Sequence, residues 1–364
     1  MNRHRQQGLN LVEMMVAMTI GLVLLAGLVT LFSNSSEAQR ELQRAAAQIE
    51  NGRYAMDTLT QDLHHAGYYG QYLVIPGAAA APDPCALATE TTLFDGLKFP
   101  VQHYPAANNT SWPDISLTSC GLLLTNANLN PGSDVVVMRR AETSVLAVGS
   151  IATTNEVYLQ ANPIAAEIQY GNGAAITAAS KASGGAATVL KKDNSAAEIR
   201  KYRVHVYFVA PCSVPAGGAT LCTGATDDGG RPLPTLKRLE LGVPAGGGAL
   251  TYTITPLAEG VEYLKVEYGI DDTPSAVSEA TGQIGDGAPD RYTRTPVLAD
   301  LGNIVTARIH VVVRNPEPSA GVDDKTYSLG LAGTFTPAAG DQFKRHGYVG
   351  EARVVNVSSR REIP

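Results

Sequence analysis

A long apolar stretch near the start of the chain places the strongest constraint on its fold. Residues 9–32 form a run of 24 residues in which only Asn10, Glu13, Thr19 and Thr30 are polar. An α-helix of about 20 residues crosses the hydrocarbon core of a bilayer. The run therefore predicts a membrane-spanning helix, with a carboxylate near its beginning that needs an explanation.

The residues on either side of this run indicate what kind of membrane segment it is. Two arginines and a histidine precede it and no acidic residue does, so the N-terminus is expected in the cytoplasm and the rest of the chain outside. A secretory signal peptide would end in a small-x-small cleavage site, but residues 33–48 continue a helical pattern. A plain signal-anchor leaves Glu13 and the pair Gly8 and Leu9 unexplained.

Gly8, Leu9 and Glu13 give the segment a resemblance to a known family. The arrangement resembles the class III signal of type IV pilins and pseudopilins. In that family a prepilin peptidase cuts after the Gly, the new N-terminal residue is methylated, and a Glu stands at the fifth mature position. The resemblance implies cleavage after Gly8, methylation of Leu9 and a role for Glu13 in assembly. Leu9 and Asn10 stand where Phe and Thr are common.

The resemblance also supplies a physical role for Glu13. A lone ionisable group at the centre of a bilayer costs roughly 2.5–3.5 kcal/mol on insertion scales, and less near the interface. In a filament core a buried carboxylate needs a cationic partner, and the family pairs it with the amine of the first mature residue, here Leu9. We therefore expect Glu13 to be satisfied only on assembly, as a register and recruitment device.

After residue 32 the sequence becomes polar but keeps helical spacing. Apolar or small residues recur every seven positions in two offset series: Leu42, Ile49, Met56 and Leu63, and Ala45, Gly52, Leu59 and Ala66. This stripe predicts a helix that packs on a sheet. Gly52 is expected to let a strand approach, and Gly67 is expected to end the helix. His64 and His65 point about 100° apart on a helix, which argues against a shared metal.

A second resemblance narrows the family. Residues 49–70, IENGRYAMDTLTQDLHHAGYYG, resemble a segment typical of PilW-type minor pilins, with ENGR, an aromatic, an acidic residue before Leu, and AGY-x-G. Residues 256–271, 287–292 and 304–315 resemble the C-terminal region of the same type. Residues 75–195 carry little of it, and we expect an insertion or an elaborated loop region there.

The region beyond residue 70 has the composition of strands and loops. Runs rich in β-branched and aromatic residues predict strands at 134–139, 156–160, 200–209, 236–241, 261–268, 304–314, 326–331 and 350–357. Gly/Ala/Pro-rich stretches predict loops or linkers at 77–84, 172–187 and 244–249. His205 and His310 fall in predicted strands and are expected on the surface or on a sheet face.

These patterns predict an α+β fold: a long N-terminal helix, transmembrane in its first half, packed on a C-terminal head rich in antiparallel β-sheet, as in pilins. The expected organisation is a leader peptide at 1–8, a transmembrane and filament-core helix at 9–32, an amphipathic extension at 33–67, a β-rich elaborated region at 68–195 and a C-terminal β-rich pilin-like domain at 196–364.

The chain has four cysteines, Cys85, Cys120, Cys212 and Cys222, which allow three disulfide pairings. The even count and the expected export favour disulfides in an oxidising compartment. We expect sequential pairing, Cys85 with Cys120 and Cys212 with Cys222. Metal ligation is the competing interpretation, but the sequence has no CxxC spacing.

One acidic loop could hold calcium, which takes several oxygen ligands on a flexible loop. Asp271 and Asp272 open it, and Asp286 and Asp290 close it. Its spacing is not that of an EF-hand, and a solvated hairpin loop is the simpler interpretation. We expect no cofactor, with calcium at this loop as the one candidate.

Enzyme motifs are absent: the sequence has no GxSxG, Walker loop, HExxH or dinucleotide-binding fingerprint. The net charge of −6 and the lack of a basic stripe do not indicate a nucleic-acid binder. The expected class is therefore a structural protein and not an enzyme.

The resemblance implies a minor pilin that primes pilus assembly, expected at the tip, and that supports adhesion and twitching motility. Its implied partners are other minor pilins, a tip adhesin, the major pilin, the assembly platform and the prepilin peptidase. Its implied location is the inner membrane, with the head in the periplasm, and then the extracellular pilus. Alternatives are a J-type minor pseudopilin of a type II secretion system and a membrane-anchored periplasmic enzyme or binding protein.

Overall fold

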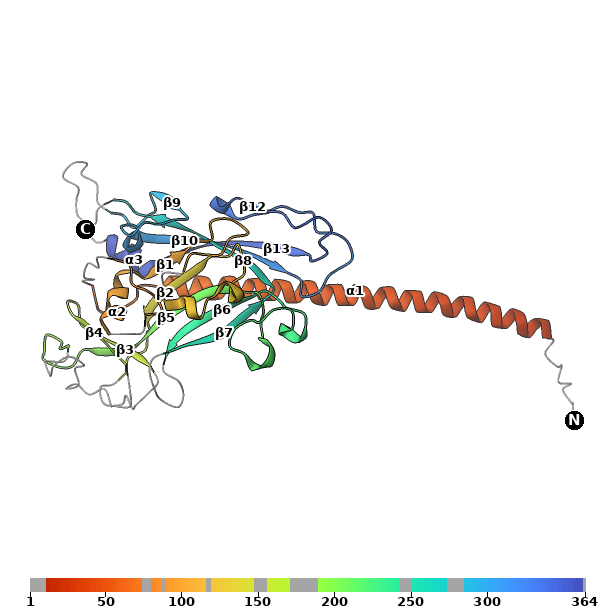
Figure 1. The fold of residues 1–364 in the computed structure, drawn as a ribbon, viewed down its shortest axis with the longest axis horizontal. Helices are drawn as coiled ribbons and strands as arrows, with labels where there is room; N and C mark the ends of the chain where they lie inside the picture. Colours follow the sequence, from red (N-terminus) through yellow and green to blue (C-terminus); the bar gives the residue numbers. More distant parts are fainter. Residues whose placement is uncertain are drawn as a thin grey trace, which may run out of the picture. The chain divides into compact units, whose positions relative to one another are not determined.

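The fold is described from a computed structural model, shown in Figure 1. It describes residues 11–73, 80–86, 90–115, 119–146, 156–170, 189–242, 251–273 and 285–362. Gly8, Leu9 and the predicted loops at 172–187 and 244–249 lie outside these residues. The chain forms two compact units, Met1–Ala47 and Gln48–Pro364.

One long helix, α1 (Leu11–His65), confirms the expected helix and its extension. In the first unit its apolar side chains are exposed, and within the described residues it is the one helix long and apolar enough to cross a membrane. The two threonines in its apolar part satisfy their hydroxyls within the helix: Thr19 donates to the carbonyl of Val16 and Thr30 to that of Gly27, each at 2.8 Å. Such bonds keep polar groups paired where no water is available.

In the second unit α1 buries one face, which differs in part from the predicted stripe. Ile49 was expected on the packed face and is 49 % exposed. The reason is geometric: an α-helix has 3.6 residues per turn, so a stripe repeating every seven residues drifts by about 20° per heptad. The residues that are buried in the structure are Gln48, Gly52, Ala55, Leu59, Asp62 and Leu63.

A seven-stranded antiparallel sheet has the order β1-β2-β5-β3-β4, with β6 paired to β5 and β7 to β6. Its strands are β1 (Val101–Tyr104), β2 (Val135–Ala141), β3 (Val157–Ala161), β4 (Ala166–Tyr170), β5 (Glu198–Ala210), β6 (Thr235–Gly242) and β7 (Thr251–Glu259). The long strand β5 pairs with β2, β3 and β6. The sheet therefore contains strands from before and after residue 195. The predicted division of the head into 68–195 and 196–364 stays a prediction.

A second antiparallel sheet has the order β13-β10-β8-β9. Its strands are β8 (Val261–Ile270), β9 (Arg291–Thr293), β10 (Ile304–Arg314) and β13 (Arg345–Arg353), and a small ribbon is formed by β11 (Tyr327–Ser328) and β12 (Thr334–Phe335). The strand predicted at 350–357 is wrong in its second half, because the helix α3 (Val355–Arg361) begins there. A short helix, α2 (Glu90–Asp95), follows the first loop.

The core shared by α1 and both sheets explains why the second half of the helix is fixed. Ala55, Leu59 and Leu63 of α1 belong to one buried apolar cluster with side chains from β2, β5, β8 and β10. A second cluster joins residues of β2, β3, β5 and β6 with the loops that carry the cysteines. Figure 1 shows this part of α1 lying along strands of the head.

Candidate functional site: the N-terminal helix and its anchorage in the head

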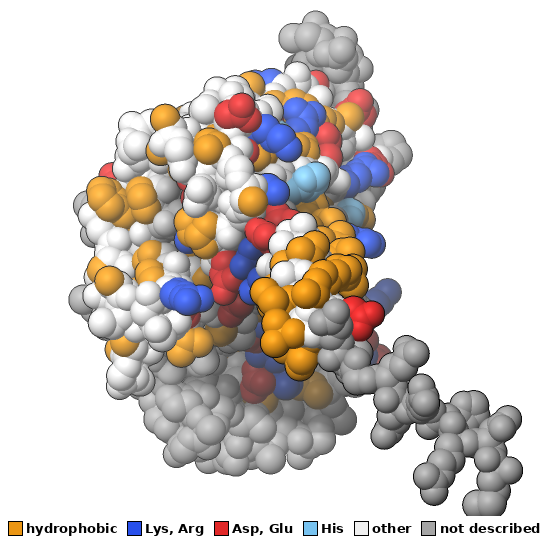
Figure 2. All heavy atoms as spheres, turned by 90° about the vertical axis from the view of Figure 1, so that its right-hand side faces the viewer, with side chains coloured by type: hydrophobic (Ala, Val, Ile, Leu, Met, Phe, Trp, Pro, Cys, Tyr) orange, Lys and Arg blue, Asp and Glu red, His pale blue; other side chains and the backbone are white. Residues whose placement is uncertain are grey.

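The apolar half of α1 carries the described part of the predicted processing and assembly site. Glu13 lies in the first turn and its side chain is exposed, as are the apolar side chains that follow it. Figure 2 shows these hydrophobic side chains gathered on the helix. Gly8 and Leu9 lie outside the described residues, so the role predicted for these three residues stays a prediction.

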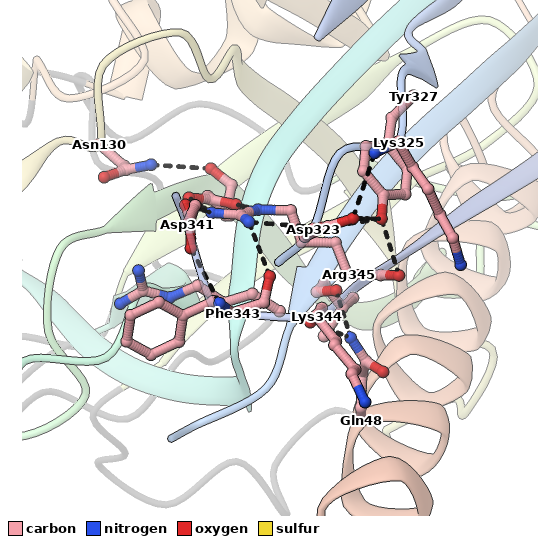
Figure 3. Close-up of polar contacts among 12 residues, drawn as sticks. Gln48, Asn130, Asp323, Lys325, Tyr327, Asp341, Phe343, Lys344 and Arg345 are labelled. Atoms are coloured by element: carbon pink, nitrogen blue, oxygen red, sulfur yellow. Dashed lines mark hydrogen bonds and ion pairs between the residues drawn. The ribbon is translucent and has the colours of Figure 1, made fainter. Parts of the chain in front are cut away.

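Gln48 fastens α1 to two strands through its side-chain amide. Its Nε2 donates to the backbone carbonyl of Val313 at 2.7 Å and to that of Lys344 at 2.9 Å. Figure 3 shows this side chain reaching from the helix to the end of β10 and the start of β13. One acceptor lies near the end of β10 and the other directly before β13, so one polar side chain on the buried helix face binds the backbone at the ends of two neighbouring strands.

Gly52 allows an aromatic ring to lie directly on the helix. A Cβ atom built on Gly52 would overlap the ring of Tyr348 in β13. One turn further on, Met56 is so close to Gly350 that a Cβ on that glycine would lie 2.6 Å from the Met56 Cε. The expected close approach of a strand at Gly52 is therefore present, and two glycines, one on each element, make it possible.

Asp62 is the polar centre of the buried face. Its carboxylate accepts from Arg140 Nε of β2 at 2.6 Å, from His205 Nδ1 of β5 at 2.6 Å and from the Tyr207 hydroxyl at 3.0 Å. The far nitrogen of His205 lies 3.7 Å from a carboxylate oxygen of Glu240 in β6. Asp62 is only 5 % exposed, so these contacts replace the water that a buried carboxylate loses.

The charges of this network stabilise one another. Burial alone would raise the pKa of Asp62, but His205, joined by Arg140, outweighs burial and holds that pKa well below its ordinary value. Burial alone would lower the pKa of His205, but Asp62 outweighs it and the pKa of the imidazole is raised. The pair is therefore an ion pair under the helix at mildly acidic pH.

The C-terminal end of α1 is closed by residues from the other end of the chain. Gly67 has φ of +76° and ends the helix as predicted. The Asn356 side chain of α3 donates to the carbonyls of His64 and Ala66, each at 3.2 Å, and Arg360 donates to the carbonyl of Gly67. Carbonyls that a helix end leaves unpaired are thus satisfied by α3.

A second buried charge cluster lies next to the Gln48 contact. Arg345, at the start of β13, contacts Glu262 at 2.6 Å, Asp341 at 2.8 Å and Asp323 at 3.4 Å. Tyr327 of β11 donates to Asp323 at 3.0 Å. Figure 3 shows Arg345 among these groups, close to Gln48 and Lys344. The cluster holds the loop before β13 against the sheet, and so supports the strand end that Gln48 binds.

Both predicted disulfides are present: Cys85–Cys120 and Cys212–Cys222. The second staples a short loop, and the buried Lys237 amine lies 3.9 Å from each of its sulfurs. A carboxylate oxygen of Asp227 and the sulfurs of Cys212 and Cys222 lie within 4.8 Å of one another, a spacing that could in principle hold a metal ion. Because the two sulfurs are bonded to each other, they offer no thiolate for a metal.

Two carboxylates of the acidic loop form ion pairs with arginines of the same chain. Asp271 is fully buried and accepts from Arg361 of α3 at 2.7 Å, and Asp272 accepts from Arg291 at 2.6 Å. Asp290 accepts the backbone N–H of Asp272 at 2.8 Å. Residues 274–284 of this loop lie outside the described residues, and calcium binding stays a prediction.

Two matches to known families accompany this geometry. Residues 3–29 match the prokaryotic N-terminal methylation motif, and residues 223–356 match the family described as type IV pilus-assembly protein W. The chain matches a PilW-type class III prepilin. No curated protein and no solved structure matches it.

A PilW-type prepilin is a structural component of a pilus, and both matches support a minor pilin that interacts with other pilus components. The methylation motif and the apolar helix together indicate a membrane anchor with a single span. The PilW match covers β6 to the start of α3, which supplies the second sheet and thus much of the surface against which α1 packs.

Several of the residues that anchor the helix were not predicted. Gln48 and Asp62 interrupt an apolar face, and a spacing of three or four residues along α1 would have placed them on it. His205 and His310 were expected on the surface or on a sheet face. Both lie on sheet faces, but they are only 3 % and 4 % exposed. The sequence does not reveal this burial because it depends on which element covers each face.

Proposed function

We propose that this chain is a minor pilin that primes assembly of a type IV pilus, takes its place at the pilus tip and supports adhesion and twitching motility. One observation carries the proposal. A methylation motif at residues 3–29 and a PilW match at residues 223–356 occur in a single chain, and the helix that overlaps the motif has a carboxylate in its first turn. The PilW match favours the pilus over the J-type pseudopilin.

In the proposed maturation, prepilin peptidase cuts after Gly8 on the cytoplasmic face and Leu9 is methylated. Before assembly the helix spans the inner membrane and the head lies in the periplasm. On entry into the filament, Glu13 pairs with the amine of Leu9 on the same or a neighbouring subunit. The pairing is favourable because a carboxylate away from water gains most from a cation beside it.

The proposed partners are other minor pilins, a tip adhesin, the major pilin and the assembly platform. The anchorage of α1 supports this role. The helix that carries Glu13 is the same helix that Gln48, Gly52 and Asp62 fix in the head. A subunit recruited through the N-terminal end of its helix brings its head into the filament with it.

Two substitutions test the proposal, each with a matched control on α1. With Gly8→Ala, we expect the leader to be retained and the pili to lack the protein. The control is Gly21→Ala, which should leave cleavage unchanged because a Cβ added at Gly21 meets no atom within 4 Å. With Glu13→Ala, the protein is expected to insert and be cleaved but to be missing from pili, whereas Glu37→Ala should be incorporated normally.

The measurements are the mass of the N-terminal peptide and the amount of protein in sheared pili relative to membranes. Normal amounts of the Glu13→Ala protein in pili would refute the assembly role. Normal cleavage of the Gly8→Ala protein would refute the processing site. If neither change affects pili or processing, a membrane-anchored enzyme or binding protein becomes the better interpretation.

A further inference from the structure

An open hollow of about 580 Å³ lies on the head between the loop after β1 and the loop that follows Cys120. Its wall includes Trp112, the single tryptophan of the chain, whose side chain is exposed to 43 %. A large aromatic side chain that a fold leaves this exposed beside a concavity is a common element of binding sites. None of the assembly contacts described above uses it.

The lining of this hollow, the Trp112 hollow, combines an apolar floor with a polar rim. Ile115 and Leu124 line it and are 5 % and 2 % exposed. Thr125 and Asn126, from the loop that follows Cys120, also line the hollow and supply a hydroxyl and an amide. Among the described lining residues there is no lysine or arginine, so the site offers no cation for a phosphate or a nucleic acid.

The backbone around Trp112 is held in place before any ligand arrives. The carbonyl of Ser111 accepts the N–H of Gly132 at 2.7 Å, and Pro113 forms a β-bridge with Ala106. Fixed walls reduce the entropy that binding would otherwise cost.

The second lining segment, which carries Leu124, Thr125 and Asn126, is hydrogen-bonded to cysteines of both disulfides. The N–H of Leu124 donates to the carbonyl of Cys120, at 2.7 Å, next to the Cys85–Cys120 bridge. The buried side chain of Asn128 donates to the carbonyl of Leu123 at 2.9 Å and accepts the N–H of Cys222 at 3.3 Å. The segment that carries Thr125 and Asn126 is thus tied to two cross-links.

We propose that the Trp112 hollow binds a carbohydrate. A pyranose ring has a face of C–H groups, which are attracted to the negative face of an indole, and a rim of hydroxyls, which need donors and acceptors. Trp112 provides the stacking surface, and Thr125 and Asn126 provide hydroxyl and amide groups for the sugar hydroxyls, with the carboxylate of Asp114 on the same rim. The volume is that of a small-ligand site and accommodates a short, uncharged oligosaccharide.

Other ligand classes fit this lining less well. A purely apolar ligand would leave the rim groups facing hydrocarbon, which is unfavourable for polar atoms. An anionic ligand would find no lysine or arginine among the described lining residues to bind it. A neutral polyol with one apolar face matches both halves of the hollow.

The single tryptophan makes the test direct. The full-length chain in detergent is titrated with galactose, lactose, N-acetylglucosamine and chitobiose while the emission of Trp112 is recorded, and the same protein is applied to a glycan array. We expect a saturable change of emission with at least one sugar, and binding on the array to glycans that contain it.

Variants separate this site from any other. Asn126→Ala keeps the reporter and should weaken the affinity about tenfold, the value of one lost hydrogen bond to a fixed partner. Trp112→Ala should abolish array binding, and Trp112→Phe should retain part of it. Gln342→Ala, which removes an exposed amide elsewhere on the head, should change nothing. Circular dichroism of each variant checks folding.

Two results would overturn the proposal. One is the absence of any emission change and of any array binding by the wild-type chain. The other is binding that persists unchanged in folded Trp112→Ala and Asn126→Ala proteins, which would place the sugar elsewhere on the molecule.

Discussion

Asp62 is the one carboxylate among the buried residues of α1, and three donors from two strands converge on it. Burying a carboxylate without partners costs several kcal/mol, so its position is set by Arg140, His205 and Tyr207. Asp62 in turn helps to fix these three side chains, because they are buried or half-buried and their polar atoms have few other hydrogen-bond partners. The helix and the seven-stranded sheet therefore fix each other's register at this residue.

The His205–Asp62 pair predicts how stability depends on pH. Because the folded-state pKa of His205 is raised, its contribution is fully present below the unfolded value near 6.5 and is lost as pH rises through the folded pKa. Because the pKa of Asp62 is lowered, its contribution is present above about pH 4 and is lost as pH falls further. The free energy of unfolding should therefore decline above neutrality in the wild-type chain, and decline less in His205→Gln.

The measurement is urea denaturation of both proteins between pH 5 and 9. His64→Gln, an exposed histidine on the same helix, serves as the control and should keep the wild-type profile. Parallel profiles for wild type and His205→Gln would show that His205 is not held protonated by Asp62.

At the level of elements, two glycines set how closely α1 and β13 approach. Gly52 accommodates the Tyr348 ring and Gly350 accommodates Met56. Helix propensity alone favours alanine over glycine by about 1 kcal/mol, so the glycine at position 52 costs local stability. The contact with the strand is what makes it favourable overall.

Gly52→Ala tests this balance of two effects. Overpacking a well-fitted contact costs typically about 1–3 kcal/mol, so the substitution should lower the free energy of unfolding despite the gain in helix propensity. In a Tyr348→Ala background the ring is gone, and Gly52→Ala should become neutral or stabilising.

A double-mutant cycle measured by denaturation isolates the coupling between these two positions. A coupling energy near zero would mean that the ring moves aside at no cost and that Gly52 does not determine the helix–strand distance.

The sequence predicted the type of most long elements and missed details that depend on tertiary contacts. Strands β5, β8 and β10 were predicted because their apolar and β-branched runs are long. Strand β7 was missed because its residues are mostly exposed or half-buried and include Pro256. The second half of the strand predicted at 350–357 is helical, since a short β-branched run does not distinguish a strand from a helix.

The candidate site was predictable where a covalent or linear pattern defines it. Both disulfide pairings and the end of the helix at Gly67 follow from local spacing. The anchorage by Gln48 and Asp62 does not follow from local spacing, because the partners are distant in the sequence. Gln48 and Val313 are 265 residues apart, and Asp62 and His205 are 143 residues apart. A single sequence does not show which distant strands will meet a helix face.

On the scale of the whole molecule, the two sheets of the head are joined through one buried carboxylate. Asp134, just before β2, is fully buried and contacts Lys265 of β8 at 3.1 Å and the N–H of Val266 at 3.2 Å. Its own N–H donates to the carbonyl of Leu264 at 2.9 Å. A strand of the first sheet and a strand of the second thus share an ion pair and backbone bonds.

This junction predicts that the head unfolds as one cooperative unit. Asp134→Ala leaves the Lys265 amine buried without its partner, which typically costs about 3–5 kcal/mol. Denaturation followed by fluorescence and by circular dichroism should give coincident single transitions in both proteins, shifted to lower urea in the variant. The exposed Asp324→Ala is the control and should be within about 0.5 kcal/mol of wild type. Two separate transitions in the wild-type chain would instead indicate independently stable sheets.

The contacts of Gln48 also constrain the order in which the protein can be made. Gln48 is synthesised 265 residues before Val313 and 296 residues before Lys344, whose carbonyls it binds. Until translation has passed those positions, the side chain of Gln48 lacks both of the carbonyls that it binds. A polypeptide truncated by a premature stop before β10 would leave the part of the helix face around Gln48 uncovered and open to chaperones and proteases. Both hydrogen bonds of Gln48 therefore form only in a chain that has been translated past Lys344.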